Sequence, residues 1–222
     1  SRCASIAYTY TEPTIFMEYA LDTAALARQE GLGGVFVSNG FMSPDAVEAT
    51  GAAIDAANVD LKAFTDDFYR KTCGARLAPV LETIRGLHKA GVHLECTTLI
   101  IPDANDSDEE LTQIASFLAD VDERLPWHIS AFRPAHKMMD RGSTPLTTLE
   151  RAWRIGRDAG LRFVYMGNAP ASDLNNTRCP SCQEVVVDRS RFPHVPAAMD
   201  DEGRCRLCGE PVIVTNPVRG TP

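Results

Sequence analysis

Four cysteines near the C-terminal end of the sequence are spaced as metal ligands. They form two Cys-x-x-Cys pairs, Cys179 with Cys182 and Cys205 with Cys208, with 22 residues between the pairs. Each pair lets two thiolates approach one ion from adjacent corners of a tetrahedron, and Gly209 suits the tight turn that follows such a pair. A redox role for one pair is the alternative, but two copies favour a metal. Because four protein ligands complete a tetrahedral shell, we predict a structural zinc site and not a catalytic one.

A second set of polar residues follows the predicted strands one after another. Singly they have ordinary explanations: Asn39-Gly40 is a common turn dipeptide, and Asp60 with Lys62 is a solvated ion pair worth less than about 1 kcal/mol. Together they favour a ligand-binding rim, because the carboxyl ends of parallel strands form the binding edge of α/β folds. The segments of this rim are Tyr10-Thr11-Glu12-Pro13, Ser38-Asn39-Gly40, Asp60-Leu61-Lys62, Thr97-Thr98 with Asn105-Asp106, 133–137 and Gly167-Asn168.

Strands and helices that would hold these residues alternate along the first 168 residues. Apolar and β-branched runs predict strands at 6–10, 35–38, 58–61, 93–101, 127–132 and 162–166, apolar on both faces where they are densest. Helix signals between them open at Pro13, Ser43-Pro44, Leu77, Ser107 and Thr147. Repeated βα units predict a parallel sheet with helices outside it. A partial barrel is favoured over an open doubly wound sheet, because no Gly-x-Gly-x-x-Gly follows the first strand.

From residue 169 to residue 222 the sequence is polar and rich in turns, so we expect a small zinc-binding tail after the α/β part at 1–168. Cys3, Cys73 and Cys96 are too far apart for a local metal site, and we expect buried thiols.

The composition narrows the class of protein. The chain has 222 residues, 44% of them hydrophobic, and a net charge of −8, which argues against a nucleic-acid partner. No apolar run approaches the roughly 20 residues that span a bilayer, and no secretory signal is visible, so we expect a cytoplasmic protein without a membrane partner. The opening Ser1-Arg2-Cys3 is interpreted as a fragment boundary.

The order and spacing of the rim motifs resemble those of radical S-adenosylmethionine (SAM) enzymes, and in particular the pyruvate formate-lyase activating enzyme class. The motifs that carry this likeness are Glu12-Pro13, Ser38-Asn39-Gly40, Asp60-Leu61-Lys62 and Ile100-Ile101-Pro102. Longer strings resemble the radical SAM member of the AmmeMemoRadiSam system: Ala7-Tyr8-Thr9-Tyr10, 58–62, Tyr69-Arg70-Lys71, Cys73-Gly74-Ala75-Arg76 and 176–182. The likeness extends from residue 6 to residue 209.

The resemblance implies a role for each matching residue in the first part of the rim. Glu12 matches the motif that holds the amino group of SAM, although Tyr10-Thr11 replaces the two glycines of that motif. Ser38 and Asn39 match a turn that lies beside the cofactor.

The later motifs match the other end of the same cofactor. Asp60 and Lys62 correspond to residues that position the SAM carboxylate, and Thr97 and Leu99 to residues near its ribose and adenine. Arg133 stands where the family often has histidine.

The implied activity is reductive cleavage of SAM to a 5′-deoxyadenosyl radical that abstracts hydrogen from a substrate, such as a site on a partner protein. The implied partners are Memo-like and AMMECR-type proteins and an electron donor such as flavodoxin or ferredoxin.

One motif of the resembled family is missing. Its Cys-x-x-x-Cys-x-x-Cys sequence, which holds the 4Fe–4S cluster, does not occur in this chain. We therefore expect a partial (β/α)6-type radical SAM barrel that lacks its first βα unit and is inactive alone, with a zinc-ribbon-like tail. The alternatives are a zinc-stabilised α/β metabolite-binding protein, or an aldolase-like barrel. The aldolase would need Lys62 as its Schiff-base lysine, and Asp60 would tend to keep that lysine charged.

Overall fold

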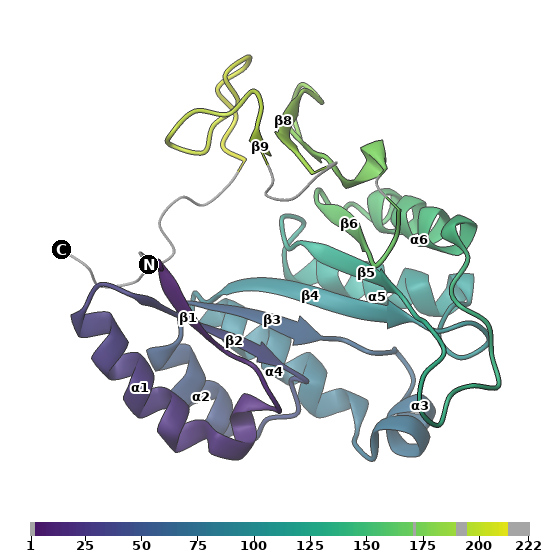
Figure 1. The fold of residues 1–222 in the computed structure, drawn as a ribbon, viewed down its shortest axis with the longest axis horizontal. Helices are drawn as coiled ribbons and strands as arrows, with labels where there is room; N and C mark the ends of the chain where they lie inside the picture. Colours follow the sequence, from purple (N-terminus) through teal and green to yellow (C-terminus); the bar gives the residue numbers. More distant parts are fainter. Residues whose placement is uncertain (1–2, 171, 190–194, 213–222) are drawn as a thin grey trace.

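The computed structural model describes residues 3–170, 172–189 and 195–212. Its main element is a six-stranded parallel sheet in the order β1-β2-β3-β4-β5-β6 (Figure 1). The strands are β1 (Ser5–Tyr8), β2 (Gly33–Ser38), β3 (Ala56–Asp60), β4 (His93–Ile100), β5 (Trp127–Ala131) and β6 (Val164–Gly167). All six predicted strands are confirmed, with ends that differ by up to two residues. The first strand ends at Tyr8, two residues earlier than predicted, and Tyr10 beyond it is 92% exposed.

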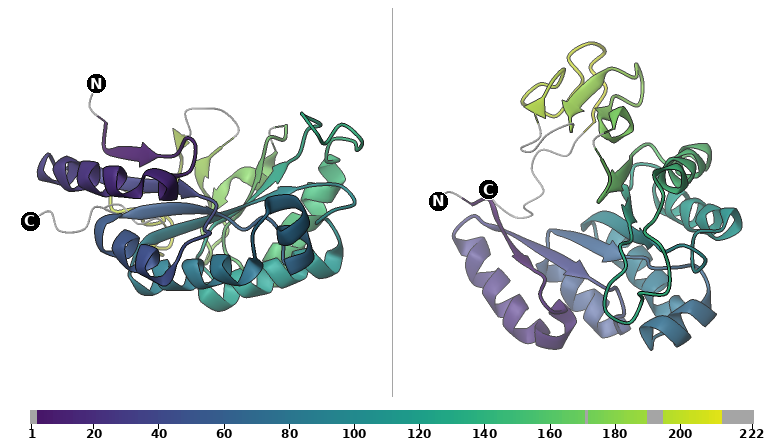
Figure 2. Two further views of the ribbon diagram at one scale, coloured as in Figure 1. Left: turned by 90° about the horizontal axis from the view of Figure 1, so that it is seen from below. Right: turned by 45° about the vertical axis from the view of Figure 1, so that its right-hand side comes forward.

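The strand order decides between the two predicted architectures. A doubly wound sheet reverses its strand order partway, whereas here each strand pairs with the next one along the chain. Since βα crossovers are right-handed, an unreversed order puts every helix on the same side. Figure 2 shows the helices as one outer layer around a curved sheet. The predicted partial barrel is confirmed.

The outer layer consists of five long helices and several short turns. The long ones are α1 (Met17–Gln29), α2 (Pro44–Ala53), α4 (Leu77–Lys89), α5 (Asp108–Val121) and α6 (Leu146–Asp158). The short ones are η1 (Pro13–Phe16), α3 (Asp66–Phe68), η2 (Tyr69–Cys73) and η3 (Asp173–Asn175). Within the described residues, no helix is long and apolar enough to cross a membrane.

The predicted helix caps are confirmed in part. Ser43 accepts a hydrogen bond from Ala46 N, and Ser107 accepts one from Glu110 N, each at 3.2 Å. In a capping box the carboxylate of Glu110 would also accept a hydrogen bond from Ser107 N. Here it accepts from Phe64 N instead, at 2.7 Å. This contact ties α5 to the segment after β3. The helix start predicted at Thr147 is wrong. The helix α6 begins at Leu146, and the residue at its N-cap, Pro145, makes no side-chain hydrogen bond.

The two faces of the sheet differ in polarity. The face toward the helices is fully buried and apolar, with Phe36, Val59, Cys96, Trp127 and Ile129 at its centre. The opposite, concave face carries the alternate residues, many of them polar: Asn58, Asp60, Glu95, Thr97, His128 and Ser130. The expectation that the densest strands are apolar on both faces is therefore wrong for β3, β4 and β5 and correct for β6, in which Val164, Tyr165 and Met166 are all buried. Helices cover only one face of a partial barrel, and the other face stays free to hold polar side chains.

A small three-stranded antiparallel sheet follows the barrel and forms the core of the C-terminal module, residues 177–212. Its strands are β7 (Thr177–Arg178), β8 (Val185–Asp188) and β9 (Val195–Pro196). The module lies over the β5 and β6 side of the barrel (Figure 1), where Cys179, Val186 and Val212 pack with Phe163 and Tyr165. The predicted boundary at 168/169 stays a prediction. Residues 190–194 and 213–222 of the expected tail lie outside the described residues, as do Ser1 and Arg2 of the interpreted fragment boundary.

The three isolated cysteines differ in environment. Cys96 is buried in the core, Cys73 is half-buried and Cys3 is exposed. The expectation of three buried thiols is therefore correct for Cys96 alone. Cys3 precedes β1, which is the edge strand of the six-stranded sheet.

Candidate functional site

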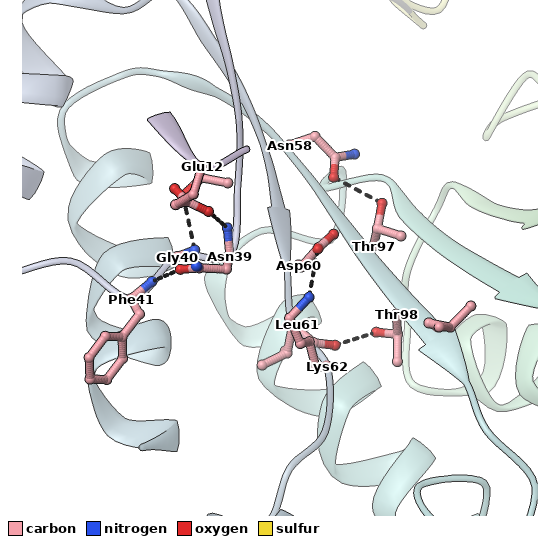
Figure 3. A network of polar contacts seen from close by, with 12 residues as sticks. Glu12, Asn39, Gly40, Phe41, Asn58, Asp60, Leu61, Lys62, Thr97 and Thr98 are labelled. Carbon is pink, nitrogen blue, oxygen red and sulfur yellow. Dashed lines mark hydrogen bonds and ion pairs between the residues drawn. The ribbon is translucent and has the colours of Figure 1, made fainter. Parts of the chain in front are cut away.

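A cleft of about 500 Å³ opens at the carboxyl ends of β2, β3 and β4. Five of the seven residues predicted to contact a cofactor line it: Asn39, Asp60, Lys62, Thr97 and Leu99. The strand register explains this convergence, because Asp60 and Thr97 are direct partners in the parallel pair β3–β4. Figure 3 shows Asn39, Asp60, Lys62 and Thr97 with their polar contacts. The segments of the predicted rim at the ends of β2, β3 and β4 thus line one cavity, whereas the segments at 133–137 and Gly167-Asn168 do not line it.

Glu12 and Ser38, the other two predicted residues, lie behind the cleft and hold the turn after β2. The buried carboxylate of Glu12 accepts the Ser38 hydroxyl at 2.7 Å and Asn39 N at 2.8 Å (Figure 3). It also caps η1 by accepting from Thr14 N at 3.3 Å. Both carboxylate oxygens therefore have protein donors, and Glu12 acts here on the position of Asn39.

Gly40 completes this turn and has no room for a side chain. Its φ is +72°, and a Cβ at this position would lie 2.6 Å from Cγ1 of Val59. The Asn39 side chain accepts from Phe41 N at 2.8 Å, which directs the chain past the cleft. Phe41 lines the cavity and is 45% exposed. The turn thus presents a polar and an aromatic side chain from one rigid segment.

Asp60 and Lys62 form an ion pair at the floor of the cleft. Lys62 Nζ lies 2.8 Å from Asp60 Oδ2, and each side chain is 37% exposed. Between charges this accessible to water, such a pair contributes less than about 1 kcal/mol to stability. Both charged groups therefore remain available to a ligand, one as an acceptor and the other as a donor. The contact also engages Lys62 Nζ with a carboxylate, which is unfavourable for the Schiff-base role of an aldolase.

Thr97 faces the same space from β4. Its hydroxyl donates to Asn58 Oδ1 at 2.9 Å, which fixes both side chains on the concave face (Figure 3). Leu99, two residues further along the same strand, is 39% exposed although it is apolar. An exposed leucine beside polar groups is typical of the apolar part of a ligand site.

Buried residues outside the predicted set hold the Asp60–Lys62 segment in place. Tyr69 accepts a hydrogen bond from Lys62 N at 3.0 Å, and burial raises the pKa of this phenol, which stays protonated. Thr98 donates to Leu61 O at 2.7 Å and accepts from the indole of Trp127 at 2.9 Å. The motif that contains Tyr69 is visible in the sequence, but its contact with Lys62 is not.

Asn105 joins the ends of two strands from the loop after β4. Its amide nitrogen donates to Lys62 O at 2.6 Å and to Leu99 O at 2.9 Å, and its oxygen accepts from Ile101 N at 2.7 Å. The side chain is 1% exposed. The sequence placed Asn105 on the rim, whereas in the structure its buried side chain lies beneath the rim and joins the ends of β3 and β4 by hydrogen bonds. We call this set of three hydrogen bonds the Asn105 clasp.

Arg133, from the fifth strand end, is exposed and does not line the cleft.

The four C-terminal cysteines converge as predicted. Their sulfur atoms all lie within 4.8 Å of one another, with Cys179 and Cys208 at 3.5 Å and Cys182 and Cys205 at 3.6 Å. A Zn–S bond of about 2.3 Å places tetrahedral sulfurs about 3.8 Å apart, so one ion fits this arrangement. A 4Fe–4S cubane would need the sulfurs further apart around a larger body.

The two Cys-x-x-Cys turns have the same backbone form. Cys179 O accepts from Gln183 N at 3.0 Å, and Cys205 O accepts from Gly209 N at 2.8 Å. Gln183 and Gly209 both have positive φ, 61° and 76°. Backbone amides point at Sγ of both Cys179 and Cys205. At Cys179 burial outweighs these contacts and raises the pKa of the thiol, whereas at Cys205 the contacts outweigh burial and lower the pKa to about 7. The predicted turn at Gly209 is confirmed, and the site suits a single tetrahedral metal ion.

No other group of this kind occurs in the described part of the chain. The four cysteines are the one set of three or more His, Cys, Asp or Glu side chains whose ligand atoms converge. A 4Fe–4S cluster needs at least three cysteines that converge around it, and among the described residues Cys3, Cys73 and Cys96 do not converge. The described residues therefore do not fit such a cluster.

Comparisons with known proteins show the family to which the chain belongs. Residues 1–118 match the Radical SAM superfamily. The chain is 39% identical over 214 residues to the uncharacterized protein MJ0808 of Methanocaldococcus jannaschii, and the match covers 96% of this chain and 63% of that protein.

Solved structures share the fold at low sequence identity. A domain of pyruvate-formate lyase-activating enzyme from Bacteroides vulgatus superposes with a TM-score of 0.64 at 18% identity, over 75% of this chain and all (100%) of that domain. SuiB of Streptococcus suis, solved bound to S-adenosylmethionine, gives a TM-score of 0.59 at 11% identity, over 74% of this chain and 39% of SuiB. Because the sequence match spans more than half of the chain and the sheet has the same fold, this chain belongs to the radical SAM superfamily.

Proposed function

We propose that this chain binds SAM in the cleft at the ends of β2, β3 and β4, and that the whole protein is a radical SAM enzyme of the activating-enzyme type. The observation that carries the proposal is the convergence of Asn39, Asp60, Lys62, Thr97 and Leu99 on one cavity. Its volume, about 500 Å³, lies within the 300–1,000 Å³ that is typical of small-molecule sites.

The charges of the cleft suit the amino-acid end of SAM. Asp60 provides an acceptor for an ammonium group, and Lys62 provides a donor for a carboxylate. In the structure these two charged groups pair with each other at 2.8 Å, and we propose that the ligand takes the place of this contact. Phe41 and Leu99 provide apolar surface for the adenosyl part, and both are unusually exposed for their types. In this proposal Glu12 acts through Ser38 and Asn39, by holding the turn against which the ligand rests.

The cluster of the proposed reaction is not held by this chain. In the superfamily a 4Fe–4S cluster supplies the electron that cleaves SAM to a 5′-deoxyadenosyl radical. The described cysteines do not fit such a cluster, and Cys-x-x-x-Cys-x-x-Cys is absent from the sequence. If the whole protein performs this reaction, the cluster ligands must come from other residues. We propose that this chain alone binds SAM without cleaving it.

The surface beside β1 supports a contact with a further part of the protein. β1 is the edge of the sheet, and four large apolar side chains near it are mostly exposed: Tyr10 at 92%, Ile15 at 78%, Tyr19 at 71% and Leu26 at 64%. Among the described residues no strand pairs with the outer side of β1, and such an edge next to an apolar helix surface is a place where another βα unit can pack.

The partners and the tail metal follow from the same proposal. We propose a single zinc ion at Cys179, Cys182, Cys205 and Cys208, with a structural role, because four protein ligands leave no open position. On the resemblance to the AmmeMemoRadiSam system, we propose Memo-like and AMMECR-type proteins as partners, and flavodoxin or ferredoxin as electron donor.

The binding step is tested by calorimetric titration of the chain with SAM. Asp60→Asn removes a charge-assisted hydrogen bond worth about 1.5–3 kcal/mol, so SAM should bind roughly 10- to 100-fold more weakly. The matched control is Asp67→Asn, which removes an exposed partner of Lys71 outside the cleft and should leave the affinity unchanged. Equal losses in both variants, or no SAM binding by the wild-type chain, would contradict the proposal.

A second candidate is a zinc-stabilised metabolite-binding protein without radical chemistry, which the lack of fitting cluster ligands favours. The two are separated by incubating the full-length protein anaerobically with SAM and dithionite and measuring 5′-deoxyadenosine. Formation of this product supports the radical SAM enzyme, and SAM binding without product supports the binding protein.

A further inference from the structure

A second cavity, of about 310 Å³, lies between the concave face of the barrel and the C-terminal module. Glu95 and Tyr165 line it from the barrel, and Thr177 and Arg189 from the module. It shares no lining residue with the cleft proposed for SAM. Glu95 precedes Thr97 by two positions on β4, so these two lining residues lie on the same face of the sheet, about 7 Å apart along the strand.

The barrel side of this cavity carries a fixed negative charge. Glu95 Oε2 lies 2.7 Å from His128 Nε2, whereas Oε1 is 3.8 Å from His93 Nε2, beyond hydrogen-bond length. Burial raises the pKa of Glu95, but the contacts with His128 and His93 lower it further, so the group is ionised at neutral pH. Oε1 thus keeps hydrogen-bonding capacity for a donor in the cavity.

The module side carries a positive charge that is held in place. The guanidinium of Arg189 stacks on the Tyr165 ring at 4.5 Å, and its Nε donates to Thr177 Oγ1 at 2.9 Å. Thr177 Oγ1 also lies 3.0 Å from Tyr165 OH, and the ring of His128 packs at 5.4 Å on Tyr165. This fixed guanidinium suits recognition of a carboxylate.

The size and the remaining walls limit the occupant. Leu125, Phe163 and Val212 add apolar surface to the cavity. The volume is at the lower end of the range for small-molecule sites and has room for a ligand of amino-acid size. A metal ion is unsupported, since His93, Glu95 and His128 do not converge as a ligand set in the described residues.

We propose that this cavity binds a free amino acid with an apolar side chain, whose ammonium group contacts Glu95 and whose carboxylate contacts Arg189. An acceptor from the barrel, a donor from the module and apolar side chains lining the same cavity match the three parts of such a molecule. The site joins the barrel to the module, so it exists only when the module is docked.

The test uses the zinc-loaded chain and L-phenylalanine or L-leucine as probes, with binding measured by calorimetry or saturation-transfer NMR. N-acetyl-L-phenylalanine lacks the ammonium group and L-phenylalaninamide lacks the carboxylate. Each should bind at least about tenfold more weakly than L-phenylalanine. Equal binding of the N-acetyl compound, or no binding of either free amino acid, overturns the proposal.

A variant pair localises the binding. Glu95→Gln keeps the shape of the side chain and should weaken binding of L-phenylalanine by about tenfold or more, with an unchanged circular dichroism spectrum. Glu82→Gln, which alters an exposed partner of Arg85 on α4, is the matched control and should have no effect. Excess SAM should not displace the amino acid. If it does, or if Glu95→Gln binds as well as the wild type, the amino acid occupies another site and the proposal fails.

Discussion

Replacement of Asn105 by alanine should destabilise the barrel strongly and weaken the proposed SAM site. The side chain is buried and makes three hydrogen bonds, to Lys62 O, Leu99 O and Ile101 N, at 2.6, 2.9 and 2.7 Å. Each such bond contributes about 1 kcal/mol net, and alanine leaves all three backbone groups unpaired in a buried place. We therefore expect a loss of about 3 kcal/mol in the free energy of unfolding.

Asn105→Asp separates the hydrogen bonds from the volume of the side chain. An aspartate still accepts from Ile101 N, but its carboxylate faces the carbonyl oxygens of Lys62 and Leu99, which repel it. Stability at pH 7 should fall at least as far as in the alanine variant. It should recover in part as the pH falls, because the protonated carboxyl group donates to one of the two carbonyls.

Urea denaturation followed by tryptophan fluorescence measures these differences, since Trp127 is fully buried in the barrel core. Gln113→Ala, an exposed change on α5, is the control and should stay within about 0.5 kcal/mol of the wild type. A loss below about 1 kcal/mol for Asn105→Ala would refute the clasp, as would an Asn105→Asp variant whose stability does not depend on pH.

Three further changes test other parts of the structure. Gly40→Ala should destabilise by more than Gly74→Ala in urea denaturation: both glycines have positive φ, which costs alanine about 1 kcal/mol, but only Gly40 would also place its Cβ 2.6 Å from Val59. Cys208→Ser should lower the metal content measured by elemental analysis from one ion per chain and increase proteolysis of the module, while the barrel keeps its far-ultraviolet circular dichroism; full metal retention would refute the site. The depressed pKa of Glu95 stabilises the fold above the ordinary pKa of 4.5, and this contribution disappears as the pH falls through the depressed pKa. The stability difference between wild type and Glu95→Gln should therefore shrink below pH 4.5, and a difference that grows there would contradict the ion pair.

The cleft residues could be predicted because they lie at the ends of strands. Asp60, Lys62 and Thr97 follow or end apolar runs, and the parallel order of the sheet brings such positions to one edge. The residues that hold them could not be predicted in the same way. Asn105 bonds to a residue 43 positions away, and Asn58 to one 39 positions away, and no local pattern encodes either pairing.

Glu12 is a residue whose motif could be recognised in the sequence but whose contacts could not be predicted from it. Its motif is visible in the sequence and places it correctly beside the turn after β2. Only the folded chain shows that its two oxygens are taken by Ser38 and by Asn39 N, 26 and 27 positions away. The residue type and spacing therefore predicted the place, and the contacts decided the function that this place allows.

The sequence by itself determined the alternation of strands and helices, the pairing of the four cysteines of the module and the edge of the sheet at which the cleft lies. These are local properties, since Cys-x-x-Cys turns and βα units are encoded over short stretches of chain. The tertiary structure alone decided the polar concave face and the cavity between Glu95 and Arg189. Both depend on which face the helices leave uncovered and on how the module packs against β6, and those depend on contacts between distant segments.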